Sequence, residues 1–191
     1  MSIPMITFDA GEALLDWIGF TEALARGHTL PKAEIGDTFL YRDPDTLLSR
    51  SAWIDGMGLA VKTANIFPRN PDAGKPMING SVCLYSDLDG TLEALVDFHL
   101  VTKWKTAGDS LLGALRLANP DSREVLIVGA GTVAASLIEG FGAAYPQAQI
   151  RVCNRTRSKA EELVARYPGT LVATALQQAV AAADIIDTCT M

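Results

Sequence analysis

The stretch EVLIVGAGTVAASLIEGFG, residues 124–142, decides the fold that this sequence predicts. It begins with a short apolar run rich in β-branched side chains, and Gly129, Gly131 and Ala134 follow in the pattern G-x-G-x-x-A. A helical stretch rich in alanine and leucine comes next. A buried parallel strand, a tight glycine turn and the start of a helix together form a site for a dinucleotide pyrophosphate.

Each small residue of this motif is required for a steric reason. Gly129 lets the chain turn sharply off the strand, and Gly131 has no Cβ atom to keep a phosphate from the backbone. Ala134 lets the helix pack closely on the strand, and the unpaired N–H groups of the first turn then face the phosphates. The alternative is a tight turn in a domain that binds no nucleotide. The expected cofactor contacts here are Gly129, Ala130, Gly131, Thr132 and Val133.

The residues after the motif alternate as in a doubly wound α/β domain. Strands are predicted at residues 149–153, 171–173 and 184–190, and helices at residues 158–167 and 176–183. Ser158 and Glu161 form a capping box for the first of these helices. The strand order would be the usual 3-2-1-4. A fourth strand without a follower exposes an apolar edge. We therefore expect a fragment of a longer chain, unless the N-terminal half or a second subunit covers that edge.

The end of the second predicted strand distinguishes NADP from NAD. NAD-specific sites usually place an acidic residue there, about 20 residues after the glycines, to bind the ribose 2′-hydroxyl. This chain has Asn154, Arg155 and Thr156. A carboxylate would repel a 2′-phosphate, whereas an arginine with neighbouring amide and hydroxyl groups would bind one. NADP is therefore expected, and NAD is the alternative if Arg155 is only a solvated turn residue. Thr188, at the end of the fourth strand, completes the expected contacts.

Composition narrows the class of protein. The chain has 191 residues, a net charge of −6 and 49% hydrophobic residues, which indicates a globular protein of one or two domains. The acidic balance argues against a nucleic-acid partner, and neither a membrane span nor a signal peptide is visible. Three widely spaced cysteines and two histidines suggest neither a metal site nor a disulfide framework. These features fit a cytoplasmic protein.

The N-terminal half predicts a mixture of strands and helices. Asp9 can cap a short helix, and Asp89-Gly90 marks a hairpin turn. Strands are predicted at residues 3–8, 47–54, 57–65, 82–85 and 92–96, helices at residues 10–15, 17–26 and 102–118, and a loop at residues 65–80. Asn119-Pro120 ends the long helix and leads into the nucleotide-binding half.

Several segments resemble the ornithine cyclodeaminase/mu-crystallin family. They are VKTANIFPRNP (61–71), GKP (74–76), the strand at 92–97, LVTKWKTA (100–107), VLIVGAG (125–131) and VCNRT (152–156). The resemblance covers nearly the whole chain in the family's order. It implies a mixed α+β domain for substrate binding and dimerisation in residues 1–119. The first part of an NAD(P)-binding Rossmann domain, a doubly wound parallel α/β sheet that is apparently truncated, would follow in residues 120–191.

The resemblance also implies substrate-binding residues. Lys62 matches a lysine of the family that contacts the substrate carboxylate. The sequence alone agrees with this, because Lys62 is a cation inside an otherwise apolar strand, and a buried cation needs an anionic partner. The alternative is a surface lysine with a solvated end. Lys105 stands where the family has an arginine, and lysine lacks the planar fork that grips a carboxylate. Lys32 aligns with a second family arginine, for which Arg50 competes, and Ser81 occupies a hydroxyl position near the substrate. These departures count against ornithine more than against an amino-acid-like anion.

Three functions remain open. The first is an enzyme that reduces a cyclic imino acid, of the pyrroline- or piperideine-carboxylate type, with NADPH, while Lys62 and Lys105 hold the carboxylate. The second is a lyase that converts ornithine into proline with bound NAD, and the third is a non-catalytic, NADPH-binding crystallin-like protein. The NADP-like residues around Arg155 favour the first.

The resemblance carries two further expectations. The catalytic aspartate of the family would lie beyond Met191, so we expect the 191 residues alone to be inactive. A homodimer that binds a small amino-acid or imino-acid substrate is also expected.

Overall fold

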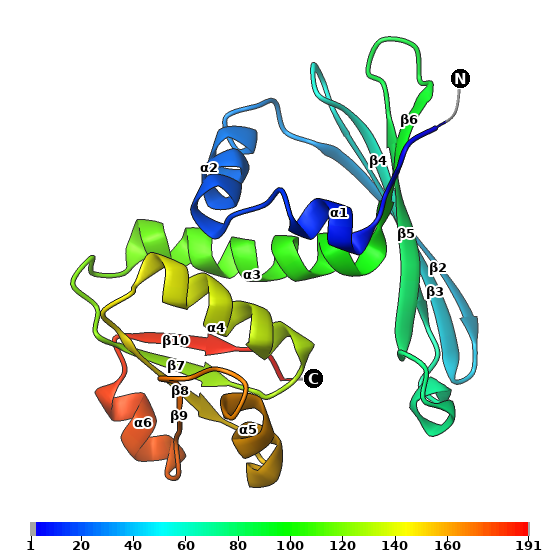
Figure 1. Cartoon of the computed structure of the whole chain (residues 1–191). Coiled ribbons are helices and arrows are strands. Elements are labelled where there is room, and N and C mark those ends of the chain that lie inside the picture. The colour runs from blue at the N-terminus through cyan, green and yellow to red at the C-terminus, as the bar shows by residue number, and fades with distance from the viewer. Residues whose placement is uncertain (1–2, 191) are drawn as a thin grey trace. The chain divides into compact units, whose positions relative to one another are not determined.

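The computed structural model describes residues 3–190, and the chain forms two compact units (Figure 1). The first unit consists of Met1–Leu15 and Arg26–Thr102, and the second of Asp16–Ala25 and Lys103–Met191. This division differs from the predicted domains 1–119 and 120–191, which stay a prediction. Each unit is described by itself below.

Aromatic packing explains why most of helix α2 (Trp17–Gly27) and most of helix α3 (Phe98–Leu117) belong to the second unit. The buried rings of Trp17 and Trp104 stack with their centroids 4.2 Å apart. Trp17 also approaches Gly140, where an added Cβ would lie 3.5 Å from the indole ring. Residues far apart in the sequence are thereby joined in one core, which sequence periodicity alone does not reveal.

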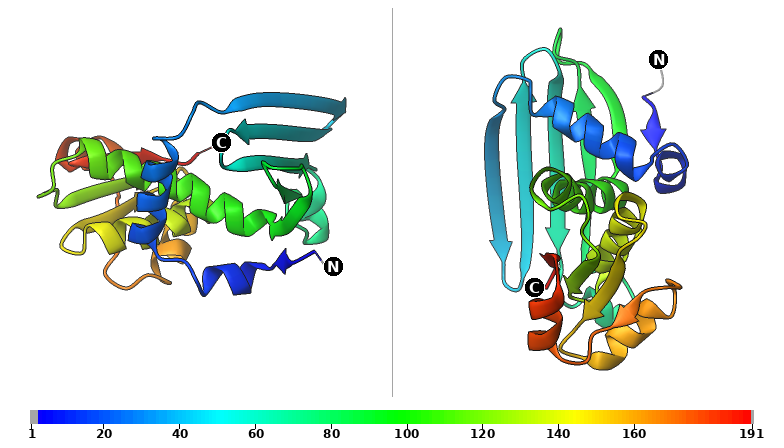
Figure 2. Two further views of the ribbon diagram at one scale, coloured as in Figure 1. Left: turned by 90° about the horizontal axis from the view of Figure 1, so that it is seen from above. Right: turned by 90° about the vertical axis from the view of Figure 1, so that its left-hand side faces the viewer.

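The first unit is built on a six-stranded sheet in the order β1-β6-β5-β4-β3-β2, in which only β1 and β6 are parallel. Its strands are β1 (Met5–Ile6), β2 (Glu34–Arg42), β3 (Asp45–Ile54), β4 (Gly58–Ile66), β5 (Ile78–Tyr85) and β6 (Leu92–Asp97). The long strands β2 to β5 lie side by side in Figure 2. One face carries the buried residues Ala64, Val82 and Ala94. On this face an added Cβ at Gly80 would lie 2.7 Å from the ring of Phe98, so a larger residue would disturb the packing.

The predicted strands that became β3 to β6 are confirmed, but other details of this unit were predicted wrongly. Thr7, not Asp9, caps helix α1 (Phe8–Glu12), and its hydroxyl accepts a hydrogen bond from the Ala10 N–H at 3.4 Å. The predicted first strand is therefore cut to Met5–Ile6, and the predicted loop contains the short 3-10 helix η1 (Asn70–Ala73). Strand β2 was missed. All of its residues are exposed, so it shows none of the burial-driven alternation on which strand prediction depends.

The second unit contains a parallel sheet in the order β10-β7-β8-β9, which confirms the predicted order 3-2-1-4 and the α/β fold. Its elements are β7 (Glu124–Val128), α4 (Thr132–Ala144), β8 (Gln149–Cys153), α5 (Arg157–Val164), β9 (Leu171–Val172), α6 (Leu176–Ala182) and β10 (Ile185–Thr188). Val125, Leu126 and Ile127 of β7 are almost completely buried, as expected for a central parallel strand.

The capping box predicted for α5 is wrong. Thr156 is the N-cap residue and makes no side-chain capping bond, while Ser158 already lies inside the helix. Glu161 instead accepts a hydrogen bond from Nε of Arg157 at 2.7 Å. Glu161 thus forms a salt bridge with a residue one helical turn earlier, and not the hydrogen bond to the N-cap backbone that a capping box requires. The helix also ends at Val164, before the predicted end at residue 167.

Candidate functional site

The glycine turn after β7 has the backbone that its motif predicts. Gly129 has a φ angle of +133°, which side-chain-bearing residues rarely adopt. A Cβ there would lie 2.7 Å from Sγ and 2.9 Å from the carbonyl oxygen of Cys189. The Gly129 N–H donates to the carbonyl oxygen of Cys153 at 2.8 Å. The turn is therefore held between the end of β8 and the residue after β10, and only glycine fits.

Gly131 has a different role from Gly129. It is the N-cap residue of α4, and a Cβ added to it would meet no atom within 4 Å. Packing within the protein therefore does not require glycine here. The open space lies beside the first-turn N–H groups of α4, where a phosphate would have to approach the backbone. Ala134 is 0% exposed, as expected for a helix packed closely on its sheet.

The strand ends place this turn at the topological switch point of the sheet. Val128 is in register with Cys153 of β8 on one side and with Thr188 of β10 on the other. The chain leaves β7 through α4 to β8, and it crosses from β9 through α6 to β10 on the opposite side of β7. Ligands of such sheets bind outside the carboxyl ends of the strands at this point. Exposed Thr188 therefore lies at the edge where a dinucleotide would bind.

The segment after β8 presents an arginine to solvent. The side-chain amide of Asn154 donates to the carbonyl oxygen of Thr156 at 2.8 Å, which shapes the turn. Arg155 is exposed, and within residues 3–190 its guanidinium makes no ion pair or hydrogen bond. Arg157 differs, because Glu161 already binds it. Of these two arginines, only Arg155 has its whole guanidinium open to an incoming phosphate, because Nε of Arg157 is bound to Glu161.

A hollow of about 440 Å³ adjoins the glycine turn. It is lined by Ala130, Lys159, Glu162, Leu163 and Arg166. Apart from Ala130, these residues come from α5 and the residues just after it. The sequence did not point to them, because charged residues on a helix usually form a solvated face.

Two side chains near the end of β10 have shifted proton affinities. Burial raises the pKa of the Cys189 thiol to about 11, so the thiol stays protonated at neutral pH, and it donates to the Val128 carbonyl oxygen at 3.6 Å. Burial also raises the pKa of Asp187, while a hydrogen bond with Ser110 acts in the opposite direction. Neither side chain was predicted to take part in binding. The half-buried, protonated thiol packs as a small side chain against Gly129.

Lys62, predicted to bind the substrate carboxylate, has a well-defined environment in the first unit. It lies half-buried on β4, where its ammonium donates to the Thr102 hydroxyl at 3.0 Å. The same Nζ lies 4.7 Å from the centroid of the Phe98 ring, within cation–π range. These contacts hold the amine against the first unit, unlike the solvated surface lysine that was the alternative.

Ser81 does not share a side of the sheet with Lys62. Its strand partner is Thr63, the neighbour of Lys62, and successive side chains of a strand point to opposite faces. The Ser81 hydroxyl lies 3.2 Å from Thr63 Oγ1, and its backbone N–H also donates to that oxygen. The structure therefore does not bring Ser81 and Lys62 together, contrary to the expectation that both face one substrate.

The other predicted cations are less constrained. Lys32 is exposed in the segment before β2. Lys105, which belongs to the second unit, forms an ion pair with Asp109 one turn along α3. Arg50, the competitor of Lys32, is the direct cross-strand partner of Lys62. Of the two competitors, Arg50 is therefore the one that the register places beside Lys62.

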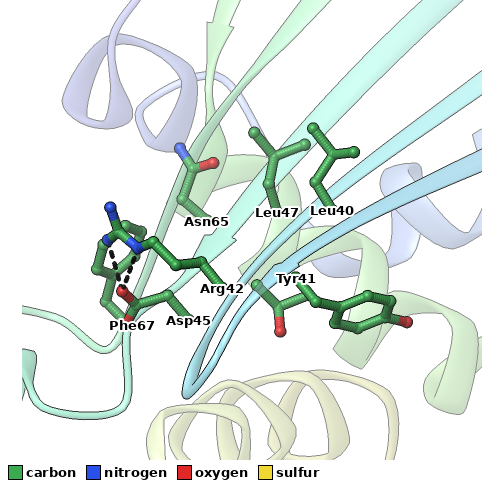
Figure 3. Close-up of a pocket in the computed structure, with 8 residues that line it drawn as sticks. Leu40, Tyr41, Arg42, Asp45, Leu47, Asn65 and Phe67 are labelled. Carbon is green, nitrogen blue, oxygen red and sulfur yellow. Dashed lines mark hydrogen bonds and ion pairs between the residues drawn. The ribbon is translucent and has the colours of Figure 1, made fainter.

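A second hollow, of about 400 Å³, lies at the end of the β2–β3 hairpin (Figure 3). Arg42 pairs with Asp45 there, and its guanidinium lies 5.8 Å from the centroid of the Phe67 ring. Leu40 and Leu47 also line it, and their register places them on the face opposite Lys62. This hollow is therefore separate from the Lys62 site.

Residues 3–190 contain no group of three or more histidine, cysteine or acidic side chains that could hold a metal ion. Over the same residues, none of the helices has both the length and the apolar character that crossing a membrane requires.

The comparisons with known proteins agree with this geometry. The model of the ornithine cyclodeaminase/mu-crystallin family matches residues 52–191. The chain belongs to this family. Its predicted resemblance is thus confirmed, and the glycine turn and Lys62 both lie inside the matched region.

Two relatives define the likeness in sequence. The chain is 46% identical over 182 residues to Delta(1)-pyrroline-2-carboxylate reductase of Paracoccus denitrificans, covering 93% of this chain and 58% of that protein. It is 32% identical over 134 residues to ketimine reductase mu-crystallin of Mus musculus, covering 70% of this chain and 43% of that protein. The chain thus spans little more than half the length of the first relative and less than half the length of the second.

Two solved structures show the same fold. Delta(1)-pyrroline-2-carboxylate reductase of Thermococcus litoralis, in complex with NADH and L-proline, matches with a TM-score of 0.84 and 20% identity, over 98% of this chain and 62% of that one. An archaeal alanine dehydrogenase dimer with bound NAD matches with a TM-score of 0.86 and 22% identity, over 100% of this chain and 61% of that one. At such identities the likeness concerns the fold.

Proposed function

We propose that this chain belongs to an enzyme that reduces a cyclic imino acid, of the pyrroline- or piperideine-carboxylate type, with NADPH. The observation that carries the proposal is the 46% identity, over 93% of the chain, to a protein named as a pyrroline-2-carboxylate reductase. A second relative is named as a ketimine reductase, and ketimines contain the same C=N group. The glycine turn and the half-buried Lys62 provide the two kinds of contact that such a reaction requires.

The chain's own residues would hold both reactants. Backbone N–H groups at residues 130–133 would receive the pyrophosphate of the cofactor, and Arg155 its 2′-phosphate. The Lys62 ammonium binds the substrate carboxylate and thereby orients the ring carbon of the C=N bond. When bound, the nicotinamide supplies a hydride to that carbon. The reduction is completed by a proton on the ring nitrogen.

Cofactor choice gives the first test. We expect Arg155→Asp to weaken NADPH binding on the order of a hundredfold and to affect NADH binding much less, because a carboxylate repels the 2′-phosphate that the guanidinium binds. Fluorescence titration with both nucleotides measures this difference, and Arg157→Asp is the matched control because Glu161 already binds that arginine. Equal loss in both variants, or tighter NADH than NADPH binding by the unchanged protein, would contradict the NADP assignment.

Turnover separates the proposed reductase from the alternatives. Net consumption of NADPH with a pyrroline or piperideine carboxylate supports the reductase. Copurified NAD together with ammonia release from ornithine would instead support the lyase. Binding of NADPH without turnover of any imine in the whole protein would support the crystallin-like role.

A homodimer is proposed through the sheet face opposite Lys62. This face carries the exposed side chains of Met5, Leu40 and Trp53, and the edge strand β2 is exposed along its whole length. The archaeal alanine dehydrogenase with the same fold is a dimer. An apolar open face of this kind calls for a covering partner.

We expect Leu40→Glu to shift the protein from dimer to monomer, because it puts a charge into the proposed apolar contact. Light scattering coupled to gel filtration measures the mass. Tyr41→Glu is the control, since Tyr41 lies next to Leu40 on the opposite face and is also well exposed. A dimer that survives in both variants would exclude this face as the interface.

The cytoplasmic location also stays a proposal, to be tested by cell fractionation.

A further inference from the structure

The hollow of about 440 Å³ in the second unit lies between the glycine turn and one side of α5. The crossovers through α4 and α5 advance in the same direction across the sheet, so right-handed connections place both helices on one face. The Tyr167 hydroxyl, just after α5, donates to Oε1 of Glu139 on α4 at 2.9 Å, which agrees with this arrangement. The glycine turn follows β7 and α5 follows β8, so the hollow reaches the carboxyl edge where a dinucleotide would bind.

Three charged side chains line this hollow. Within residues 3–190, Lys159, Glu162 and Arg166 make neither a salt bridge nor a side-chain hydrogen bond. Arg157 on the same helix differs, because Glu161 binds it. The hollow therefore offers two cations that Glu162 does not neutralise, beside the apolar side chain of Leu163, which is 1% exposed.

The two cations lie far apart along α5. Lys159 is in the first turn of the helix, four residues after Arg155. Arg166 comes seven residues later, roughly 10 Å farther along at 1.5 Å per residue, and its guanidinium lies 5.9 Å from the centroid of the Tyr167 ring. Because a crossover helix carries the chain back toward the start of the next strand, Arg166 is the farther of the two from the carboxyl edge. Lys159 is the cation on the cofactor side.

Charge balance gives Lys159 a role. A phosphate monoester carries a charge of about −1.5 to −2 at neutral pH, and the guanidinium of Arg155 supplies only one positive charge. An ammonium on the other side of the phosphate would balance the remainder and add a charge-assisted hydrogen bond. Lys159 is exposed and has its donors open for such a contact.

We propose that the hollow receives the adenosine 2′-phosphate of NADPH and that Lys159 is its second cation, opposite Arg155; this inference rests on the proposed function and deepens it. The side chains of Ala130 and Leu163 would contact the ribose. The Glu162 carboxylate keeps the phosphate at the Lys159 end, because it repels an anion farther along the hollow.

A class of ligand follows from this assignment. The hollow recognises a nucleotide by the phosphate on its ribose, and this contact needs neither the nicotinamide nor the substrate. Adenosine 2′,5′-bisphosphate is therefore expected to bind by itself and to compete with NADPH. AMP, which lacks only the 2′-phosphate, should bind much more weakly. Adenosine 3′,5′-bisphosphate has the same charge at another position and is the control for charge alone.

The test compares Lys159→Met with Arg157→Met and Arg166→Met in the whole protein. Each variant removes one positive charge: from the cofactor end of the hollow, from the same helix outside the hollow, and from the far end. For Lys159→Met we expect the Kd of NADPH and of adenosine 2′,5′-bisphosphate to rise on the order of tenfold, the usual effect of losing a charge-assisted hydrogen bond. The Kd of NADH and of AMP and the thermal unfolding temperature should hardly change. Arg157→Met and Arg166→Met should leave all these values unchanged.

Two further measurements distinguish direct binding from a structural role. Lys159→Arg keeps the charge and the donors, so we expect NADPH affinity within a few-fold of that of the unchanged protein. A phosphate monoester gains a proton at a pH of about 6, so the preference for adenosine 2′,5′-bisphosphate over AMP should shrink as the pH falls through that value. The shrinkage should be smaller in Lys159→Met, and a merely structural lysine would not alter this pH profile.

Three outcomes would overturn the role of Lys159. The first is an equal loss of NADPH and NADH affinity in Lys159→Met, which would show that the variant disturbs the glycine turn. The second is a larger loss in Arg166→Met than in Lys159→Met. The third is equal binding of the two adenosine bisphosphates, which would show that charge alone is recognised.

The proposed function can fail separately. If the unchanged protein reduces no imine but Lys159→Met selectively loses adenosine 2′,5′-bisphosphate, the assignment of the hollow stands and the reductase is wrong. If the unchanged protein reduces the imine with NADPH and Lys159→Met binds NADPH equally well, the reductase stands and the assignment of the hollow is wrong.

Discussion

Replacement of Lys62 by methionine is expected to lower kcat/KM for a cyclic imino acid on the order of a hundredfold, while NADPH still binds with its normal affinity. Methionine keeps most of the side-chain volume and loses only the charge, whose hydrogen bond to a carboxylate is worth about 1.5–3 kcal/mol. The amine is already held by Thr102 and the Phe98 ring, so its position does not depend on the ligand. Steady-state kinetics and a nucleotide titration of the same preparation measure both effects.

Thr102→Val provides the control for this experiment. It removes the hydroxyl that accepts from Lys62 but leaves the ammonium, so a loss of no more than about tenfold is expected from the missing neutral hydrogen bond. Lys62→Met with unchanged kcat/KM would show that the lysine has only a structural role. A parallel fall in NADPH affinity would show instead that the variant disturbs the fold.

The two glycines of the cofactor turn should give opposite results when each is changed to alanine. Gly129→Ala is expected to destabilise the second unit by at least about 1–3 kcal/mol, the usual cost of a strained backbone conformation, because of its positive φ and the contact with Cys189. Gly131→Ala has open space around the new methyl group, so the unfolding free energy should hardly change. It should nevertheless weaken NADPH binding strongly, since the methyl group lies where a phosphate must approach.

Thermal unfolding without nucleotide and NADPH titration of each variant test this pair. If both variants are equally stable and both bind NADPH normally, the turn does not hold the pyrophosphate. If Gly131→Ala unfolds as readily as Gly129→Ala, the space around Gly131 is not open in solution.

The cofactor turn could be predicted from the sequence because its determinants are local. Val125 to Ala134 specify a buried strand, a turn that needs glycine and a closely packed helix within ten consecutive residues. The same holds for the hairpin of β5 and β6, which Asp89-Gly90 marks. In such segments hydrophobic periodicity and turn residues agree, and the structure follows them.

The substrate side could not be predicted in the same way, because it depends on register. Whether Arg50 or Lys32 lies beside Lys62, and whether Ser81 shares its face, is decided by how β3, β4 and β5 pair over long sequence separations. A shift of one residue in that pairing exchanges the two faces. The missed strand β2 is a related case, since its exposed residues carry no signal of burial.

Because of the contact between Gly129 and Cys189, the nucleotide-binding turn forms only when the whole parallel sheet is folded. The turn takes its shape from a carbonyl 24 residues ahead and from a strand end 60 residues ahead, so a chain still leaving the ribosome cannot form it until residue 189 has emerged. A dinucleotide that recognises this turn therefore binds only the assembled sheet. By mass action it would stabilise that state by about 2.7 kcal/mol at a free concentration a hundred times its Kd. Cellular NADPH would then act as a folding ligand for this unit as well as a reductant.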